Sequence, residues 1–96
     1  RPTLGVAVGA RLRNGTVDEV RMSVGCIGPK SMRLPELEAQ IQGTRISEAS
    51  RIVAEAKHYL RDLLRPVDDL LGSAEYKLYM TGMMLRDALG QAVSSK

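Results

Sequence analysis

The fold is decided by residues 4–24, which read LGVAVGARLRNGTVDEVRMSV. The even-numbered positions on both sides of an Asn14-Gly15 turn signal are apolar: Leu4, Val6, Val8, Ala10 and Leu12 before it, then Val20, Met22, Val24 and Cys26 after it. Alternation with a period of two is typical of strands that bury one face. The stretch therefore predicts an antiparallel β-hairpin.

The length of the connecting loop follows from the need to bury both apolar sets on one face. A two-residue Asn14-Gly15 turn pairs even-numbered residues with odd-numbered ones, which sends the two sets to opposite faces. A three-residue loop over 13–15, with Gly15 left-handed in a bulge, pairs Val8 with Val20 and keeps both sets together. We therefore expect the three-residue loop.

After the hairpin, turn and capping residues divide the chain into one short strand and three helices. The strand is expected at 31–34, and the helices at 35–42, at 47–65 with Ser47 as N-cap, and at about 73–92. Pro35 opens the first helix, Gly43 stops it, and Pro66 ends the second. The predicted fold class is α+β: an antiparallel β-hairpin or three-stranded sheet followed by, and packed against, three α-helices.

The last expected helix is apolar on nearly all sides. One side carries Tyr76, Met80, Met83 and Met84, and the other carries Leu78, Leu85 and Leu89. One small core cannot cover both sides, so one of them is expected to face a partner. For the isolated chain, the expected partner is a second copy in a symmetric homodimer.

Composition limits both the size of the domain and its class. The 96 residues are 44% apolar and contain neither Phe nor Trp, so 1–96 is expected to form a single domain with an aliphatic core. The net charge of +3 is spread over both signs, which argues against nucleic-acid binding. A single cysteine and the lack of a long apolar segment or cleavable leader favour a cytoplasmic protein with no membrane contact.

Two side chains with chemical potential, Cys26 and His58, are better explained as structural. Cys26 has no CxxC partner and no nearby histidine, so we interpret it as a buried thiol. His58 falls on the solvent side of its expected helix, opposite the apolar stripe. The methionines at 80, 83 and 84 would suit a pliable partner groove, but methionine at helical spacing is more often part of a core.

Two short motifs also favour turns over chemistry. Asp68-Asp69 are adjacent residues after a proline, and they lack the opposed geometry of an acid and base pair. Gly25-x-x-Gly28 follows a strand, but Pro29 removes an N–H donor that a phosphate loop needs. No catalytic, cofactor-binding or metal-binding residue is therefore predicted in this chain.

Two stretches together resemble the C-terminal domain of the FAD-binding (flavoprotein) subunit of molybdenum hydroxylases, the carbon monoxide dehydrogenase and xanthine dehydrogenase family. Residues 25–33, GCIGPKSMR, are similar to that family's Gly-Gly-x-Gly-Pro-x-Pro-x-Arg turn, and residues 72–76 match its Gly-Ser-Ala-Glu-Tyr signature. Cys26 replaces a usual Gly, Ser31 a usual Pro, and Leu78 stands where relatives are expected to carry a charge. The last difference favours the leucine stripe as the outward side of the terminal helix.

The resemblance implies a structural and packing domain, present here as a fragment without the upstream FAD-binding domains. In such enzymes a molybdopterin subunit oxidises the substrate, and iron–sulfur clusters carry electrons through FAD to an acceptor such as NAD. The implied partners are the FAD-binding domains of the same subunit and the molybdopterin and iron–sulfur subunits. FAD is held mainly by the preceding domains, so no flavin contact is assigned here and the fragment is expected to be inactive alone. A free-standing interaction or dimerisation module without flavin chemistry remains the alternative.

Overall fold

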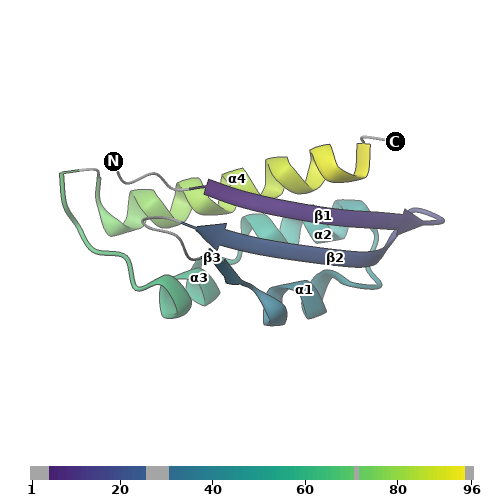
Figure 1. Cartoon of the computed structure of the whole chain (residues 1–96), viewed down its shortest axis with the longest axis horizontal. Helices are drawn as coiled ribbons and strands as arrows, with labels where there is room; N and C mark the ends of the chain where they lie inside the picture. The colour runs from purple at the N-terminus through teal and green to yellow at the C-terminus, as the bar shows by residue number, and fades with distance from the viewer. Residues whose placement is uncertain (1–4, 26–30, 71, 95–96) are drawn as a thin grey trace.

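The computed structural model describes residues 5–25, 31–70 and 72–94 as a three-stranded antiparallel sheet with four helices (Figure 1). The strands lie in the order β1-β2-β3. The elements are β1 (Gly5–Arg13), β2 (Thr16–Gly25), β3 (Ser31–Arg33), α1 (Pro35–Ile41), α2 (Ile46–Ala54), α3 (Lys57–Leu64) and α4 (Ala74–Ser94). The α+β prediction is confirmed, with four helices where three were expected.

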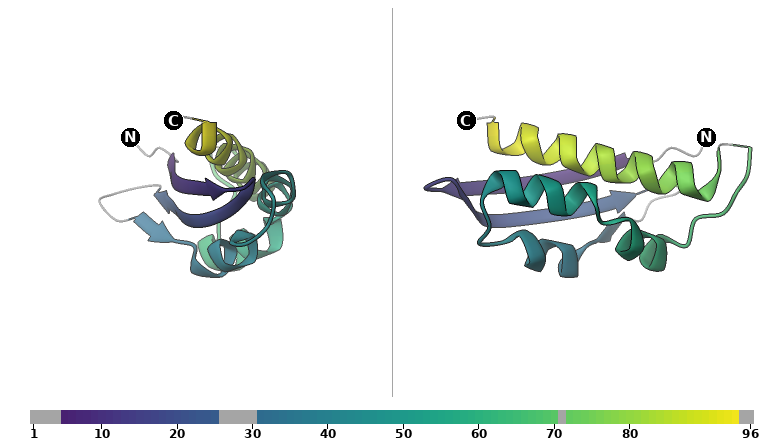
Figure 2. Two further views of the ribbon diagram at one scale, coloured as in Figure 1. Left: turned by 90° about the vertical axis from the view of Figure 1, so that its right-hand side faces the viewer. Right: turned by 180° about the vertical axis from the view of Figure 1, so that it is seen from behind.

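All the described helices lie on one face of the sheet (Figure 2). Val20, Met22 and Val24 of β2 point into the core and are at most 7% exposed, whereas Glu19 and Arg21, on either side of Val20, are exposed. Because alternate side chains of a strand point to opposite faces, this burial identifies the covered face. The prediction of a half-buried hairpin is confirmed.

The predicted three-residue loop is wrong, although the argument about faces was sound. Arg13 pairs with Thr16, so the turn has two residues, Asn14 (φ 54°) and Gly15 (φ 82°). The pairing also shifts between Arg11 and Leu12, which leaves Asp18 as an extra residue in β2. That bulge, rather than a longer loop, restores the common apolar face.

Beyond the bulge the predicted pairs are displaced by two residues. Val8 pairs with Met22 and Ala10 with Val20, so even-numbered residues do meet even-numbered ones, but Val8 does not pair with Val20. Between the bulge and the turn the parity reverses, and odd-numbered Val17 is fully buried. Sequence alternation alone could not show this, because a bulge and a one-residue longer loop give the same parity.

The predicted strand at 31–34 and the predicted helix at 35–42 are both confirmed, as β3 and α1. β3 pairs antiparallel with the end of β2, and α1 begins at Pro35. Gln42 caps α1, and Gly43 follows with φ +87°, a left-handed conformation that glycine adopts without strain. Leu4, Cys26 and Gly28 lie outside the described residues.

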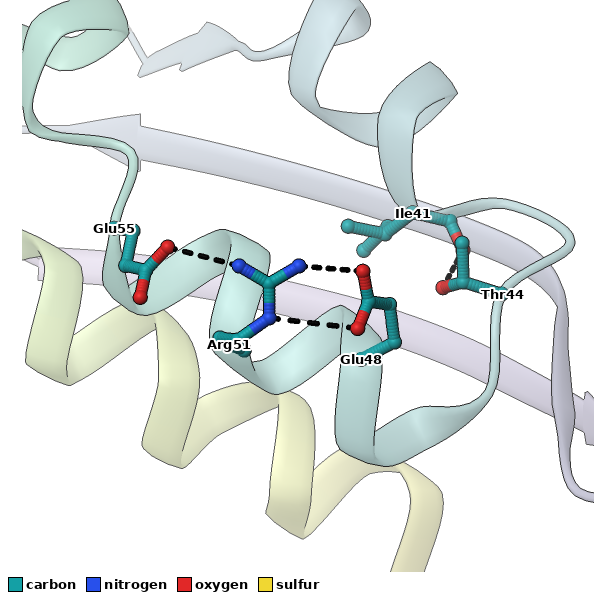
Figure 3. A network of polar contacts seen from close by, with 5 residues as sticks. All are labelled: Ile41, Thr44, Glu48, Arg51 and Glu55. Carbon is teal, nitrogen blue, oxygen red and sulfur yellow. Dashed lines mark hydrogen bonds and ion pairs between the residues drawn. The ribbon is translucent and has the colours of Figure 1, made fainter.

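The expected helix over 47–65 is two helices, α2 and α3, which begin one residue earlier and break at Glu55 and Ala56. No Gly or Pro marks the break; the Glu55 N–H is shared among the carbonyls of Arg51, Ile52 and Val53, as at a helix end. Arg51 donates hydrogen bonds to Glu48 and Glu55 across this last turn (Figure 3).

The start of α2 is fixed by the hairpin and not by the predicted Ser47 cap. Arg45 occupies the N-cap position without a side-chain cap, and the Ile46 N–H reaches the Gly15 carbonyl at 3.3 Å. Thr44 donates its hydroxyl to the Ile41 carbonyl at 2.6 Å and so closes the turn between α1 and α2 (Figure 3). Backbone pairing with the hairpin therefore replaces the local cap.

The prediction that the leucine stripe of the last helix faces outward is wrong. Leu78, Leu85 and Leu89 of α4 are at most 2% exposed, whereas Tyr76 and Tyr79 on the other side are 53% and 59% exposed. The helix packs on β1 and α2, and a bulky charge at position 78 would lie in that contact. The core is aliphatic, as composition predicted: Val17, Val20, Met22, Val24, Leu34, Leu37, Ile41, Ala49, Val53, Leu60, Leu78, Leu85 and Leu89.

Candidate functional site

The described part of the first signature stretch ends in an ion pair between an exposed arginine and a buried glutamate. Arg33, its last residue, donates two hydrogen bonds to Glu38 of α1, at 3.2 Å from Nε and 2.6 Å from Nη2. The Glu38 carboxylate also accepts the Met22 N–H at 2.8 Å. One side chain thus joins β2, β3 and α1 at the edge of the sheet.

The surroundings of Glu38 keep its carboxyl group ionised. Its burial alone would raise the pKa, but the hydrogen bonds from Arg33 and the Met22 N–H, with the positive charges of Arg33 and Arg21, outweigh this. The pKa of Glu38 therefore lies below its ordinary value. A carboxylate held in this state suits a structural anchor better than a proton donor.

The second signature stretch, 72–76, builds the start of α4. The Ser73 hydroxyl accepts the Tyr76 N–H at 3.0 Å as an N-cap, and Asp68 accepts the Ala74 N–H at 2.6 Å. Gly72 has φ +138°, and a Cβ there would lie 3.1 Å from the Tyr76 ring. Each of these residues fits the tight entry into the helix.

Glu75, the acidic member of the same signature, connects α4 to α3. It pairs with Lys57 at 2.5 Å and with Arg61, and the hydrogen bond from Lys57 is the main reason that the pKa of Glu75 is lowered. All three side chains are at least 40% exposed, so these ion pairs orient the helices more than they stabilise the fold.

The residues singled out for chemistry in the sequence stay apart in the structure. Asp68 caps α4 and Asp69 pairs with Lys77 at 2.8 Å, so both serve the turn, as predicted. His58 is exposed on α3, again as predicted. Met80, Met83 and Met84 are half-buried on α4. Cys26 and Gly28 lie outside the described residues, so their predicted roles remain predictions.

Two hollows lie on the described surface. One, of about 280 Å³, lies over α1, α2 and α3; the other, of about 390 Å³, lies beside the exposed face of the sheet. The second is lined by Gly9, Ala10, Glu19, Val20, Arg21, Arg33, Glu38 and Gln42. Glu19 pairs with Arg11, and Glu38 with Arg33.

These linings do not fit a flavin or a metal ion. A flavin needs a deep and mostly apolar pocket, whereas both hollows are open, the first is lined by mixed apolar, polar and charged side chains, and half of the residues that line the second are charged. Among residues 5–25, 31–70 and 72–94, no three His, Cys, Asp or Glu side chains gather as a metal site requires. In that same part of the chain, no helix is long and apolar enough to cross a membrane.

Sequence reasoning missed the anchoring role of Glu38 and the exposed apolar residues of the α3–α4 loop. Glu38 lies five positions after Arg33, and no period of strand or helix links the two. Val67 and Leu70 of the loop are 63% and 104% exposed. The proline and paired aspartates there indicate a turn, but no local signal says which way its apolar side chains point.

Comparison with known proteins agrees with the signatures. The family described as the CO dehydrogenase flavoprotein C-terminal domain matches residues 2–92. The carbon monoxide dehydrogenase medium chain of Hydrogenophaga pseudoflava is 31% identical over 91 residues, which make up 94% of this chain and 31% of that protein. This chain thus spans less than a third of that relative.

Solved structures share the fold. A chain of the carbon monoxide dehydrogenase of H. pseudoflava, in a form lacking the Mo-pyranopterin moiety of the molybdenum cofactor, superposes with a TM-score of 0.74 at 31% identity. A chain of the cyanide-inactivated Cu,Mo-CO dehydrogenase gives a TM-score of 0.72 at 23% identity. Each match covers 93% of this chain and 30% of the other. The chain therefore belongs to the CO dehydrogenase flavoprotein C-terminal domain family.

Proposed function

We propose that residues 1–96 are one domain, the C-terminal packing domain of the FAD-binding subunit of a molybdenum-containing dehydrogenase of the carbon monoxide or xanthine dehydrogenase type. The domain contributes no catalytic, cofactor-binding or metal-binding residue. Its role is to complete the subunit around a flavin that other domains hold. In this role it supports electron transfer from iron–sulfur clusters through FAD to an acceptor such as NAD.

The observation that carries the proposal is that the described polar residues of both signature stretches make their contacts within the domain. Arg33 reaches Glu38, Ser73 caps α4, and Glu75 pairs with α3. None of these residues is directed to a pocket that would fit a flavin. The pairing of these described side chains within the domain supports a scaffold role, because a ligand site needs donors and acceptors that remain available.

The implied partners follow from the proposed place in the enzyme. They are the FAD-binding domains of the same subunit and the subunits that carry molybdopterin and the iron–sulfur clusters. The medium chain of H. pseudoflava CO dehydrogenase is the named relative that motivates this assembly. The enzyme is proposed to work in the cytoplasm, and the domain without its partners is proposed to be inactive and to pair as a homodimer.

The proposal is tested with two proteins, the complete polypeptide that carries this sequence and the 96-residue chain alone. The complete polypeptide should be yellow and retain FAD after desalting, as read from its visible absorbance. The chain alone should be colourless and should not oxidise NADH. Absence of flavin from the complete polypeptide, or a stoichiometric flavin on the chain alone, would overturn the proposal.

A further inference from the structure

The helix α3 has few buried side chains. Of its eight residues only Leu60 is buried, whereas the seven-residue α1 buries three: Leu37, Glu38 and Ile41. α3 lies at the lower edge of the molecule in Figure 1, on the side away from the hairpin turn. Because burial of apolar side chains is the main force that holds a helix to a core, α3 is held less firmly than α1.

A surface hollow separates part of α3 from its neighbours. The hollow of about 280 Å³ is lined by His58 and Tyr59 at the start of α3, and by residues of α1 and α2 that include Leu37 and Ile52. Side chains that line an open hollow lack contacts on one side, so the dispersion attraction between α3 and these two helices is reduced. Among the described elements, α3 therefore packs mainly on α4.

The helical backbone is interrupted at both ends of α3. At its start, Glu55 and Ala56 separate it from α2. At its end, Arg65 has φ +49°, a left-handed conformation that is unfavourable for a residue other than glycine. Pro66 follows and has no backbone N–H with which the helix could continue. The two interruptions allow α3 to move as a unit, and the movement can relax the backbone of Arg65.

Solvent-exposed polar contacts connect α3 to its neighbours. Glu75 of α4 pairs with Lys57 at 2.5 Å and with Arg61, which lies one turn further along α3. The Tyr59 hydroxyl donates a hydrogen bond to Glu36 of α1 at 2.9 Å. The ion-paired side chains are 40–59% exposed, so water and salt screen their attraction. A rise in ionic strength therefore weakens the contact between α3 and α4.

We infer that α3 opens from the domain as one unit, with hinges at 55–56 and at Arg65 and with the ion pairs of Glu75 as its latch. The sheet and the other helices stay closed when it opens, because Leu60 is the one buried side chain that α3 contributes to the core. Opening exposes Leu60 together with the partly buried Leu63 and Leu64. The domain thus has a second conformation that ionic strength controls. This device goes beyond the proposed packing role and does not depend on it.

Hydrogen–deuterium exchange of the complete polypeptide, followed by mass spectrometry, measures this opening. Peptides that cover 57–64 should exchange about tenfold faster than peptides that cover 78–89 of α4, because exchange follows the population of the open form. Raising NaCl from about 0.02 M to about 0.5 M shortens the Debye length to a few Å and should speed exchange at 57–64 about threefold. Exchange at 78–89 should not change, because that part of α4 is held by buried leucines.

Variants of the latch residues test the ion pairs directly. Glu75→Gln removes both ion pairs and should speed exchange at 57–64 about fivefold, after which added salt should have little further effect. Asp87→Asn, which also removes an exposed ion pair of α4, is the matched control and should exchange like the wild type. Tyr59→Phe keeps the ring but loses the hydrogen bond to Glu36, and it should speed exchange at 57–64 about threefold.

Exchange at 78–89 separates the opening of α3 from unfolding of the whole domain. Acceleration by Glu75→Gln that spreads equally to 78–89 overturns the inference, and so does a wild-type α3 that exchanges as slowly as 78–89. An effect of salt that persists undiminished in Glu75→Gln also overturns it, because the latch would then lie elsewhere. The flavin absorbance of the same samples tests the proposed function independently.

Discussion

Glu38 shows how one residue can connect three elements. Its carboxylate accepts a backbone N–H from β2 and two hydrogen bonds from Arg33 at the end of β3, while its own backbone belongs to α1. The short strand β3 has three residues, so side-chain anchoring matters more to it than its few ladder bonds. The signature arginine therefore anchors β3 to α1 at the edge of the sheet.

The first prediction concerns the loss of this anchor. Glu38→Ala leaves the buried Met22 N–H without its acceptor, and the free energy of unfolding should fall by about 1–3 kcal/mol. Urea denaturation followed by circular dichroism measures the change. Gln40→Ala on the exposed side of α1 is the control, and an equal loss there would show that the helix and not the anchor is being probed.

The second prediction concerns pH. Because the pKa of Glu38 is lowered in the folded state, its contribution to stability is present above the ordinary value of 4.5 and is lost as pH falls through the lower, folded value. The difference in unfolding free energy between the wild type and Glu38→Gln should therefore shrink as the pH is lowered below 4.5. A difference that stays constant down to acid denaturation would contradict the lowered pKa.

The third prediction concerns the hairpin turn. Gly15 has φ +82°, where a β-branched side chain is strained, so Gly15→Val should cost roughly 1–3 kcal/mol. Asn14→Gly is the control, because Asn14 also has positive φ and glycine accepts that conformation. Thermal melting of both variants decides the matter, and equal melting temperatures would show that the turn adjusts its backbone.

At the scale of elements, α4 is the piece that holds the layers together. It packs on β1 and α2, and Gly82 faces the end of α2, where a Cβ would lie in ordinary van der Waals contact with the Ala54 carbonyl oxygen, at 3.6 Å. Its leucine stripe faces inward and its tyrosines face outward. The residue expected at position 78 in the family had favoured an outward leucine stripe, and the structure has the opposite orientation.

The fourth prediction follows from this orientation. Leu85 is completely buried, so Leu85→Ala should reduce the unfolding free energy by about 2–5 kcal/mol through lost contacts and a cavity. Asp87→Ala, exposed two residues further along the same helix, should change it little. Denaturant titration of both proteins is the measurement. Similar stabilities would mean that the two sides of α4 have been exchanged.

The sequence predicted those elements whose signals are local. The alternation of apolar residues marks the two strands of the hairpin. Pro35 and Gly43 mark the start and the end of α1, and the long helical period marks α4. The helix break at Glu55 and the bulge at Asp18 have no Gly or Pro to mark them, because both are imposed by packing against other elements. The orientation of α4 is likewise decided by its packing on β1 and α2, because both of its sides are apolar in the sequence.

At the scale of the whole molecule, the structure separates a closed core from one apolar end. The inward leucines leave no stripe to form the dimer expected from sequence, so self-association needs another surface. Four large apolar side chains of the α3–α4 loop and the start of α4 are more than half exposed: Val67, Leu70, Tyr76 and Tyr79.

The last prediction is that the isolated chain associates through these four exposed side chains. Sedimentation at micromolar concentration should show a dimer for the wild type, and a folded monomer for Leu70→Asp with Tyr79→Asp, because both side chains are more than half exposed. Leu78→Glu with Leu85→Lys should unfold the chain instead, since each buries a charge in the core. A wild type that is monomeric would contradict the prediction. If the double aspartate variant is still a dimer, the association must use another surface. The uncovered face of the sheet is then the candidate, because Gly5, Ala7 and Gly9 leave its backbone exposed.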